Sequence, residues 1–249
     1  MTSDRTLFFG GSFNPIHSAH LACSAAAARE AGFAVVVLIP SHQPVHKARA
    51  YDFAPAEDRL AMTMLAGEAA SGSLSPGLTY RVDALELERD GPTYTIDTVE
   101  ALQQRDVKKD VKKGAKKGAN KGVERGVERD VDKGVDKGVD KGVVKSVKKI
   151  DWLIGADQLL NLHRWHRFDE LMKRTQFWVM QRPGYTIDWQ SVDERCMALR
   201  ERVVSVPQMD VSATAIRQRV REGLPIDHLV PDRVRDYILA RKLYINTVP

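Results

Sequence analysis

Short apolar runs that resemble strands alternate with longer helix-like stretches along most of this chain. The strand-like runs fall at residues 7–9, 35–40, 79–87, 150–155, 176–180 and 202–206. Helical patterns are expected at about 18–31, 56–70, 95–104, 212–222 and 231–241, with short pieces up to residue 173. Such alternation is typical of a parallel sheet covered by helices on both faces. The sequence therefore predicts a doubly wound α/β fold in a single domain over residues 1–249.

One segment interrupts this alternation. Residues 107–149 consist of tetrapeptides such as VKKG and VDKG, rich in Lys, Gly, Val and Asp. A period of four lies near the 3.6 residues of a helical turn, but each glycine costs a helix about 1 kcal/mol relative to alanine. No aromatic residue occurs between Ala101 and Ile150, so little surface is available for burial. We expect a flexible or partly helical insertion within the domain, with a regular long helix as the alternative.

The formal charge of +5 comes from this insertion. It carries 15 Lys and Arg against 7 Asp and Glu, whereas the rest of the chain has 23 basic and 26 acidic residues. A Lys-rich arm attracts nucleic acid without sequence preference. Interleaved acids and the lack of stacking aromatic residues argue against such a partner here.

No run of eighteen apolar residues occurs, and the N-terminus lacks the pattern of a secretory signal. We therefore expect a cytoplasmic protein without a membrane partner. Cys23 and Cys196 stand at no metal-like spacing and are expected to be free thiols. The sequence leaves open whether the protein is a monomer or a homodimer.

The stretch GGSFNPIHSAHL at residues 10–21 leads from the first strand-like run into the first helix. Gly10 and Gly11 remove side chains where backbone amides could approach a ligand, and a helix N-terminus attracts phosphate. His17 and His20, three residues apart, fall on one face and can donate hydrogen bonds to the same anion. Ligands of doubly wound sheets bind beyond the carboxyl ends of the strands. The stretch therefore predicts a phosphate site.

The sequence gives less support to different roles for these histidines. The chain has neither GxxxxGK[ST] nor GxGxxG, so it shows the motif of neither a Walker NTPase nor an ordinary dinucleotide-binding domain. A zinc site from His17, His20, His42 and His46 would lack nearby cysteine or carboxylate ligands. A capping or packing role for one histidine is the remaining alternative.

A second anion site is indicated by VSATAIR at residues 211–217. Ser212 and Thr214 can cap a helix N-terminus, from which Arg217 can reach a phosphate. The alternative is a simple helix cap followed by a surface arginine.

Four stretches together resemble the nucleotidylyltransferase superfamily, and within it the bacterial nicotinate-nucleotide adenylyltransferases. They are GGSFNPIHSAH, IPSHQPVHK (39–47), GPTYTIDT (91–98) with LIGADQL (153–159), and VSATAIR. The resemblance covers nearly the whole chain outside the insertion and implies a Rossmann-like sheet. It also implies transfer of AMP from ATP to nicotinate mononucleotide, giving deamido-NAD and pyrophosphate in NAD biosynthesis.

By this resemblance, His17, His20 and Arg217 would be catalytic, stabilising charge as the α-phosphorus of ATP is attacked. Asp157 would contact the adenylyl ribose, although a lone carboxylate at a strand end is otherwise more often a helix cap. The residues implied in ATP binding are Gly10, Gly11, Ser12, Phe13, His17, His20, Gly155, Asp157, Ser212, Thr214 and Arg217.

The resemblance places the pyridine mononucleotide near a second group of residues. Trp165 would stack on the pyridine ring, and backbone amides around Gly91 and His166 would recognise the nicotinate carboxylate. The alternative for Trp165 is a tryptophan of the hydrophobic core, and that for Lys47 is a solvated surface lysine. The residues implied are Lys47, Gly91, Thr93, Tyr94, Thr95, Trp165, His166 and Arg182.

The implied reaction is an in-line displacement without a covalent intermediate or a general base, because the attacking phosphate is already deprotonated. Mg²⁺ would arrive on ATP rather than in a protein metal site. The alternatives are a sibling transferase that uses nicotinamide mononucleotide or another phosphate acceptor, and a nucleic-acid-binding protein that uses the basic insertion. Ala19 departs from the family pattern, which usually has glycine between the histidines. The methyl is tolerable if residue 19 is helical, but it could crowd a close backbone contact.

Overall fold

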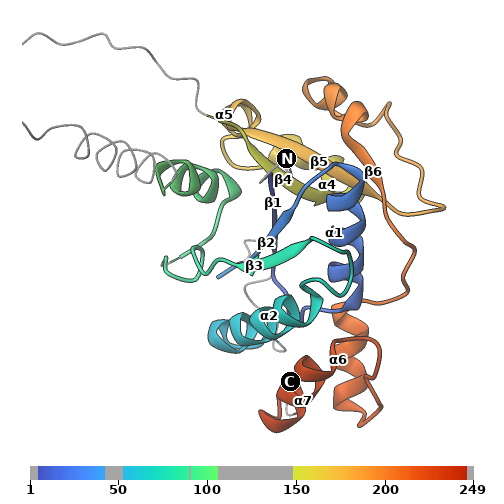
Figure 1. The fold of residues 1–249 in the computed structure, drawn as a ribbon. Coiled ribbons are helices and arrows are strands. Elements are labelled where there is room, and N and C mark those ends of the chain that lie inside the picture. Colours follow the sequence, from blue (N-terminus) through green and yellow to red (C-terminus); the bar gives the residue numbers. More distant parts are fainter. Residues whose placement is uncertain (1–4, 43–52, 90, 106–147, 246–249) are drawn as a thin grey trace, which may run out of the picture.

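A computed structural model describes residues 5–42, 53–89, 91–105 and 148–245. Six parallel strands form one sheet in the order β3-β2-β1-β4-β5-β6 (Figure 1). The strands are β1 (Thr6–Gly11), β2 (Val35–Pro40), β3 (Thr79–Val82), β4 (Ile150–Gly155), β5 (Thr175–Gln181) and β6 (Val203–Ser205). The chain moves outward from β1 to β3 and then returns to the other side of β1 with β4. The switch point of the sheet therefore lies between β1 and β4, where open α/β sheets bind ligands.

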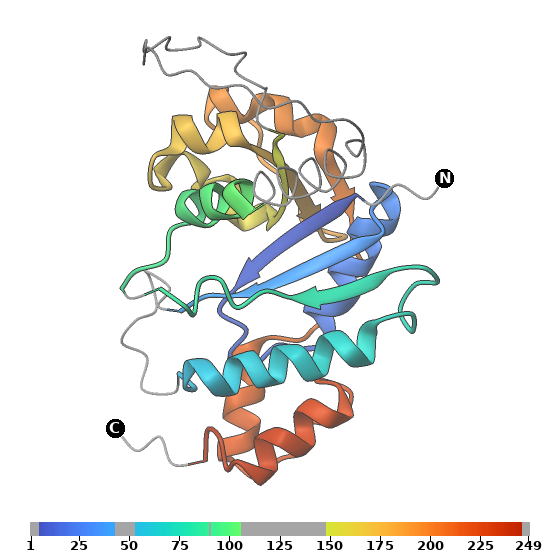
Figure 2. The same cartoon turned by 60° about the vertical axis from the view of Figure 1, so that its left-hand side comes forward.

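Helices cover both faces of the sheet (Figures 1 and 2). The α-helices are α1 (Ser18–Glu30), α2 (Ala56–Ala70), residues 95–105, α4 (Ala156–Leu159), α5 (Phe168–Arg174), α6 (Ala213–Arg221) and α7 (Asp232–Ala240). The 3₁₀ helices are η1 (Leu162–Arg164) and η2 (Glu194–Arg202). None of the helices in the described ranges has the length and apolar character needed to cross a membrane.

Alternating residues of the strands pack into two hydrophobic cores. Leu7 and Phe9 of β1 join the core beneath α1 and α2, whereas Phe8 between them packs against the core beneath residues 95–105 and α5. Trp152 and Leu153 of β4 divide between the two cores in the same way. A strand with both faces buried requires this alternation, so the expected doubly wound parallel fold is confirmed.

Most predicted elements agree with the structure, but two boundaries differ. The strand expected over 79–87 ends at Val82 because the Asp83 carboxylate accepts the N–H of Leu85, and the N–H of Leu87 donates to the Ala84 carbonyl, which turns the chain. Gly10 and Gly11 do not follow the first strand but form its last two residues, paired with Ile39 and Pro40 of β2.

The insertion predicted at 107–149 lies outside the described residues except for its last two. The side chain of Gln103 donates to the carbonyl of Lys148 at 3.1 Å, and the Lys149 ammonium donates to the Met172 carbonyl at 3.1 Å. Lys148 and Lys149 therefore belong to the folded part. The two sides of the insertion meet at Gln103, next to the point where β4 begins.

The C-terminal helices pack against α2 and the start of α1. The buried Asp58 of α2 accepts hydrogen bonds from Tyr237 and Arg241 at 2.8 and 3.1 Å. The Leu229 carbonyl accepts the N–H of Ser18, the first residue of α1, at 2.9 Å. Residues far apart in sequence thus hold the loop between β1 and α1.

Candidate active site

His17 and His20 lie together at the carboxyl end of β1. Their rings stack with centroids 3.6 Å apart, and the backbone N–H of His17 donates to Nδ1 of His20 at 3.2 Å. Because Nδ1 of His20 accepts a hydrogen bond, its neutral ring carries the proton on Nε2 and can donate it to a ligand. Phe9 and Phe13 contact the same ring, with centroids 6.0 and 5.2 Å away.

His17 is neutral at physiological pH. It is 5% exposed, and burial together with the positive charge of Arg182 lowers its pKa to about 4. Its Nδ1 is buried without a hydrogen-bond partner in the described part of the chain. A buried nitrogen in this state favours a ligand that supplies the missing hydrogen bond.

The start of α1 supplies fewer backbone donors than its sequence suggests. The N–H of Ser18 donates to Leu229, and that of His20 to the His17 carbonyl. These two backbone N–H groups are therefore already engaged within the protein. Ala19 is helical and 2% exposed, so the condition under which its methyl group is tolerable is met.

The two glycines make room for aromatic rings. A Cβ on Gly10 would lie 2.7 Å from the ring of Trp152, and one on Gly11 would lie 2.8 Å from the ring of Phe13. Phe13 itself has a φ of 42°, which turns the chain sharply after β1. The packing of these rings is thus the reason for glycine that the structure shows, whereas sequence reasoning assigned the glycines to ligand approach.

Asn14 connects this loop to three other segments. Its side-chain oxygen accepts hydrogen bonds from the N–H of Ala54 and the hydroxyl of Tyr244, at 2.9 and 3.0 Å. Its carbonyl accepts from the Arg217 guanidinium at 2.9 Å. Ser212 caps α6 by accepting the N–H of Ala215 at 3.2 Å. The two predicted anion sites therefore come together, because Arg217 reaches the loop that precedes His17.

Arg59 is a buried cation that the sequence analysis missed. It is 1% exposed, and its guanidinium donates to the carbonyls of Ser12, Ser41, His42 and Ala54. Burial lowers its pKa to about 10, so it stays charged at neutral pH. Since the C=O and N–H of a trans peptide point in opposite directions, these bonds turn the N–H groups of Phe13 and His42 away from Arg59.

A cavity of about 750 Å³ opens beside the ends of β1, β2 and β4. Several residues predicted for ATP binding and several predicted for the mononucleotide line it together. They are Gly10, Gly11, Ser12 and Asp157 from the first group, and Thr93, Tyr94, Thr95, Trp165 and His166 from the second. Its volume is within the range of small-molecule sites.

The mononucleotide side of this cavity is aromatic. The rings of Tyr94 and His166 lie 4.3 Å apart, and Trp165 packs edge-on against Phe177 at 6.1 Å. Tyr94 precedes the helix of residues 95–105, whereas His166 follows η1. Two segments that the insertion separates in sequence thus form neighbouring walls of the cavity.

Glu86 is a second lining residue that the sequence analysis missed. It is 5% exposed, and its carboxylate accepts the hydroxyl of Thr98 at 2.8 Å. A further hydrogen bond to the Thr93 side chain lowers its pKa, but burial has the larger effect and raises the pKa overall. The sequence analysis assigned residue 86 to a strand, and a single acid within such a run does not by itself indicate a site.

The remaining predicted residues lie outside the cavity lining. Phe13, His17, His20 and Arg217 form the neighbouring histidine group, which meets the cavity where Gly11 contacts Phe13. Arg182 follows β5 and is not among the cavity-lining residues, and its positive charge is the smaller of the two causes that lower the pKa of His17. Gly155 precedes Asp157 at the end of β4, and Gly91 adopts a φ of 85° ahead of Thr93. Lys47 and His46 lie outside the described residues.

Several more lining residues gave little sequence signal. Ser41 lies in the IPSHQPVHK stretch, whereas Trp152, Gln158, Asn161, Arg164 and Leu171 reach the cavity through the path of the chain after β4. Arg59 shares the buried stripe of α2 with Met62, Ala66 and Ala70. A charged residue on an apolar stripe is the one feature that could have identified it.

Comparison with known proteins agrees with this geometry. Residues 8–219 match the family described as cytidylyltransferase-like. A protein of Herpetosiphon aurantiacus named "Probable nicotinate-nucleotide adenylyltransferase" is 32% identical over 245 residues, covering 97% of this chain and 98% of its own. A protein of Bacillus pumilus with the same name is 30% identical over 236 residues, covering 95% and 96%.

Solved structures share the fold. Two structures of the Plasmodium falciparum nicotinic acid mononucleotide adenylyltransferase, one complexed with NaAD and one with APC, superpose with TM-scores of 0.64 and 0.62. They are 14% and 13% identical to this chain, and each comparison covers 99% of it and 100% of the Plasmodium chain. The family match and the relatives that align along nearly their whole length show that this chain belongs to the nicotinate-nucleotide adenylyltransferase family.

Proposed function

We propose that this protein transfers AMP from ATP to nicotinate mononucleotide, giving deamido-NAD and pyrophosphate for NAD biosynthesis. The observation that carries the proposal is the stacked pair of His17 and His20 at the switch point of the sheet, beside the Arg217 contact with Asn14. Family membership at about 30% identity over nearly the full length supports this choice of reaction.

The chemistry needs no enzyme nucleophile. The phosphate of the mononucleotide attacks the α-phosphorus of ATP in line, the new P–O bond forms, and the bond to pyrophosphate breaks. A phosphate is already ionised near neutral pH, so no general base is needed, and catalysis consists of positioning and charge stabilisation. In this proposal, Nε2–H of His20 donates to the reacting phosphate, while Arg217 and Arg182 stabilise negative charge near it.

The cavity offers separate places for the two substrates. We place the adenylyl group of ATP by Gly10, Gly11, Ser12 and Asp157. The pyridine ring then lies at the aromatic wall of Tyr94, Trp165 and His166. In this arrangement the acceptor phosphate and the α-phosphorus meet near the end of β1.

We propose that Mg²⁺ enters with ATP. Mg²⁺ prefers oxygen ligands and usually combines one or two carboxylates with substrate phosphates and water. The described cavity lining includes the carboxylates of Asp157 and Glu86, and the Glu86 carboxylate already accepts a hydrogen bond from the Thr98 hydroxyl. The donor set therefore fits an ion held largely by the phosphates of ATP, where it would neutralise charge on the leaving group.

The proposal extends to the protein as a whole. We infer one catalytic domain over residues 1–249 that acts on small molecules as a monomer or a homodimer. Cys23 and Cys196 are buried free thiols, which fits a reducing compartment such as the cytoplasm.

The test is release of pyrophosphate from ATP in the presence of each candidate acceptor, followed by identification of the dinucleotide product. We expect release that depends on nicotinate mononucleotide and is much slower with nicotinamide mononucleotide. Faster release with the amide, or none with either acceptor, would overturn the proposal. His20→Ala serves as the matched inactive control.

A further inference from the structure

Arg167 occupies an unusual backbone position directly after the cavity-lining residues Trp165 and His166. It precedes α5 with φ 52° and ψ 45°, in the left-handed region that glycine adopts most readily. A non-glycine residue persists there when its surroundings hold it in place. The side chain of Arg167 shows what holds it.

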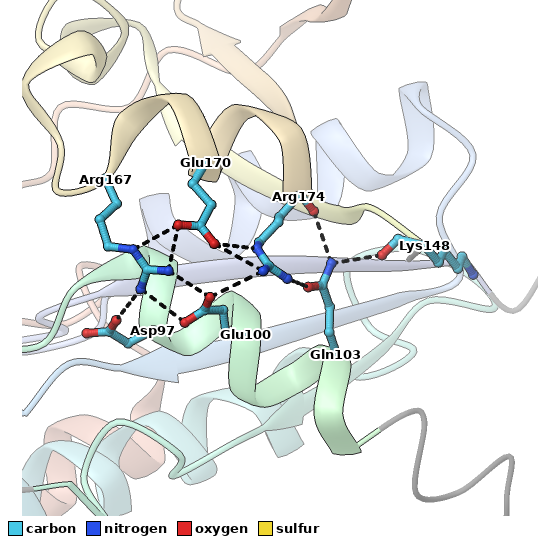
Figure 3. A network of polar contacts seen from close by, with 7 residues as sticks. All are labelled: Asp97, Glu100, Gln103, Lys148, Arg167, Glu170 and Arg174. Atoms are coloured by element: carbon cyan, nitrogen blue, oxygen red, sulfur yellow. Dashed lines mark hydrogen bonds and ion pairs between the residues drawn. The ribbon is translucent and has the colours of Figure 1, made fainter. Parts of the chain in front are cut away.

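The guanidinium of Arg167 connects two helices (Figure 3). It donates to both carboxylate oxygens of Glu100, at 3.1 and 2.9 Å, and to Glu170 at 3.0 and 2.6 Å. Asp97 lies 3.5 Å from the same guanidinium. Asp97 and Glu100 belong to the helix of residues 95–105, whereas Glu170 belongs to α5. Arginine suits this role because its planar fork can bind two carboxylates at once.

A second layer continues the network toward the insertion. Arg174 pairs with Glu170 at 3.0 Å and with Glu100 at 3.4 Å, and donates to the side chain of Gln103 at 3.0 Å. Gln103 in turn donates to the carbonyls of Lys148 and Arg174. Figure 3 shows these contacts as one row between the two helices. The network therefore fixes how the helix before the insertion lies against α5.

The network lies next to the mononucleotide side of the cavity. Tyr94 immediately precedes the helix that carries Asp97 and Glu100, and His166 immediately precedes Arg167. The rings of Tyr94 and His166 are 4.3 Å apart. Apolar residues such as Ile96 and Leu171 pack the two segments into one core, but such packing is non-directional. The ion pairs of Arg167 add directional contacts between the same two segments beside the cavity.

We propose that Arg167 is a positioning residue that sets the spacing between the Tyr94 and His166 walls and thereby the fit of the mononucleotide substrate. The inference rests on the proposed adenylyl transfer. Arg167 acts through its neighbours and is not itself among the cavity-lining residues. The ATP side, at the ends of β1 and β4, lies outside this network.

Arg167→Gln tests the proposal through steady-state kinetics with each substrate varied in turn. We expect the KM for nicotinate mononucleotide to rise roughly tenfold, while kcat and the KM for ATP stay within about twofold. The melting temperature should fall by no more than about 3 °C, because half-exposed ion pairs add little stability. Arg195→Gln is the matched control, since Arg195 pairs with Asp169 of α5 and with Asp193 but not with residues 95–105.

Two further variants separate the guanidinium from the backbone turn. Arg167→Gly keeps the left-handed turn and removes the ion pairs, so it should match Arg167→Gln; Arg167→Lys keeps one charge without the fork and should fall between wild type and Arg167→Gln. An unchanged KM in Arg167→Gln or Arg167→Gly, or an equal rise in Arg195→Gln, would overturn the inference. Wild type without any activity on nicotinate mononucleotide would instead overturn the proposed function.

Discussion

The backbone N–H of His17 donates to Nδ1 of His20, and the two imidazole rings stack with centroids 3.6 Å apart. One histidine thus fixes the tautomer of the other, so that neutral His20 carries its proton on Nε2 before a ligand arrives. Preorganised donors stabilise a transition state strongly because they need not reorganise during the reaction.

Replacement of His20 by alanine should lower kcat by about 10²- to 10³-fold, the usual cost of one preorganised donor at a developing charge. The KM for ATP should change much less, because the lost bond matters most in the transition state. Initial rates of pyrophosphate release measure both constants. His228→Ala, at an exposed histidine, is the control, and near-full activity of His20→Ala would contradict the assigned role.

The stability of the protein should fall in mild acid because of His17. Its pKa is about 4 in the folded protein and about 6.5 in the unfolded chain, so the unfolded state binds more protons between these values. The associated stability is fully present above pH 6.5 and is lost as the pH falls toward 4, by up to about 3 kcal/mol. Urea unfolding at several pH values should show a shallower decline for His17→Asn than for wild type; equal slopes would show that His17 does not contribute.

Gly10→Ala should destabilise the protein by roughly 1–3 kcal/mol, because the added Cβ would lie 2.7 Å from the ring of Trp152 in a packed core. Displacement of this ring should also lower activity, since Trp152 lines the cavity. Gly67→Ala is a matched control in the last turn of α2, where the new methyl would make an ordinary contact of 3.5 Å with Val82. That control should be neutral or stabilising by up to about 1 kcal/mol. Equal destabilisation of the two variants would contradict this account.

Replacement of residues 107–147 by a Gly-Ser linker of about six residues should leave the fold and turnover largely unchanged. Gln103 already bonds to Lys148, so a linker that spans about 3.3–3.6 Å per residue can close the gap. Circular dichroism, thermal unfolding and pyrophosphate release measure the result. Lys148 and Lys149 must be kept, because they contact Gln103 and Met172. Loss of activity in a folded deletion variant would show that the insertion takes part in function.

The main features of the fold could be predicted because their signals are local. Strand-like and helix-like runs alternate along the chain, and each predicted strand outside residues 83–87 appears in the sheet. The error at 83–87 arose because the side chain of Asp83 accepts a backbone N–H and turns the chain, whereas hydrophobic periodicity does not report such a bond.

The candidate site could be predicted only in part, because only some of its residues have a local signal in the sequence. His17, His20 and Arg217 occur in short motifs whose spacing indicates phosphate chemistry. Arg59 and Glu86 do not, because their roles depend on which distant segments surround them. The effect of the Arg182 charge on the pKa of His17 likewise depends on the fold, because the two residues are far apart in sequence.

The sequence by itself thus determined the succession of strands and helices along the chain and predicted a phosphate site, because periodicity and short motifs depend on neighbouring residues. Tertiary structure alone decided which residues share the cavity, the low pKa of His17 and the bond from Gln103 to Lys148 across the insertion. It also decided the Arg167 network between residues 95–105 and α5. Burial, electrostatic interaction and hydrogen bonding act through space, so they arise only when the folded chain brings distant residues together.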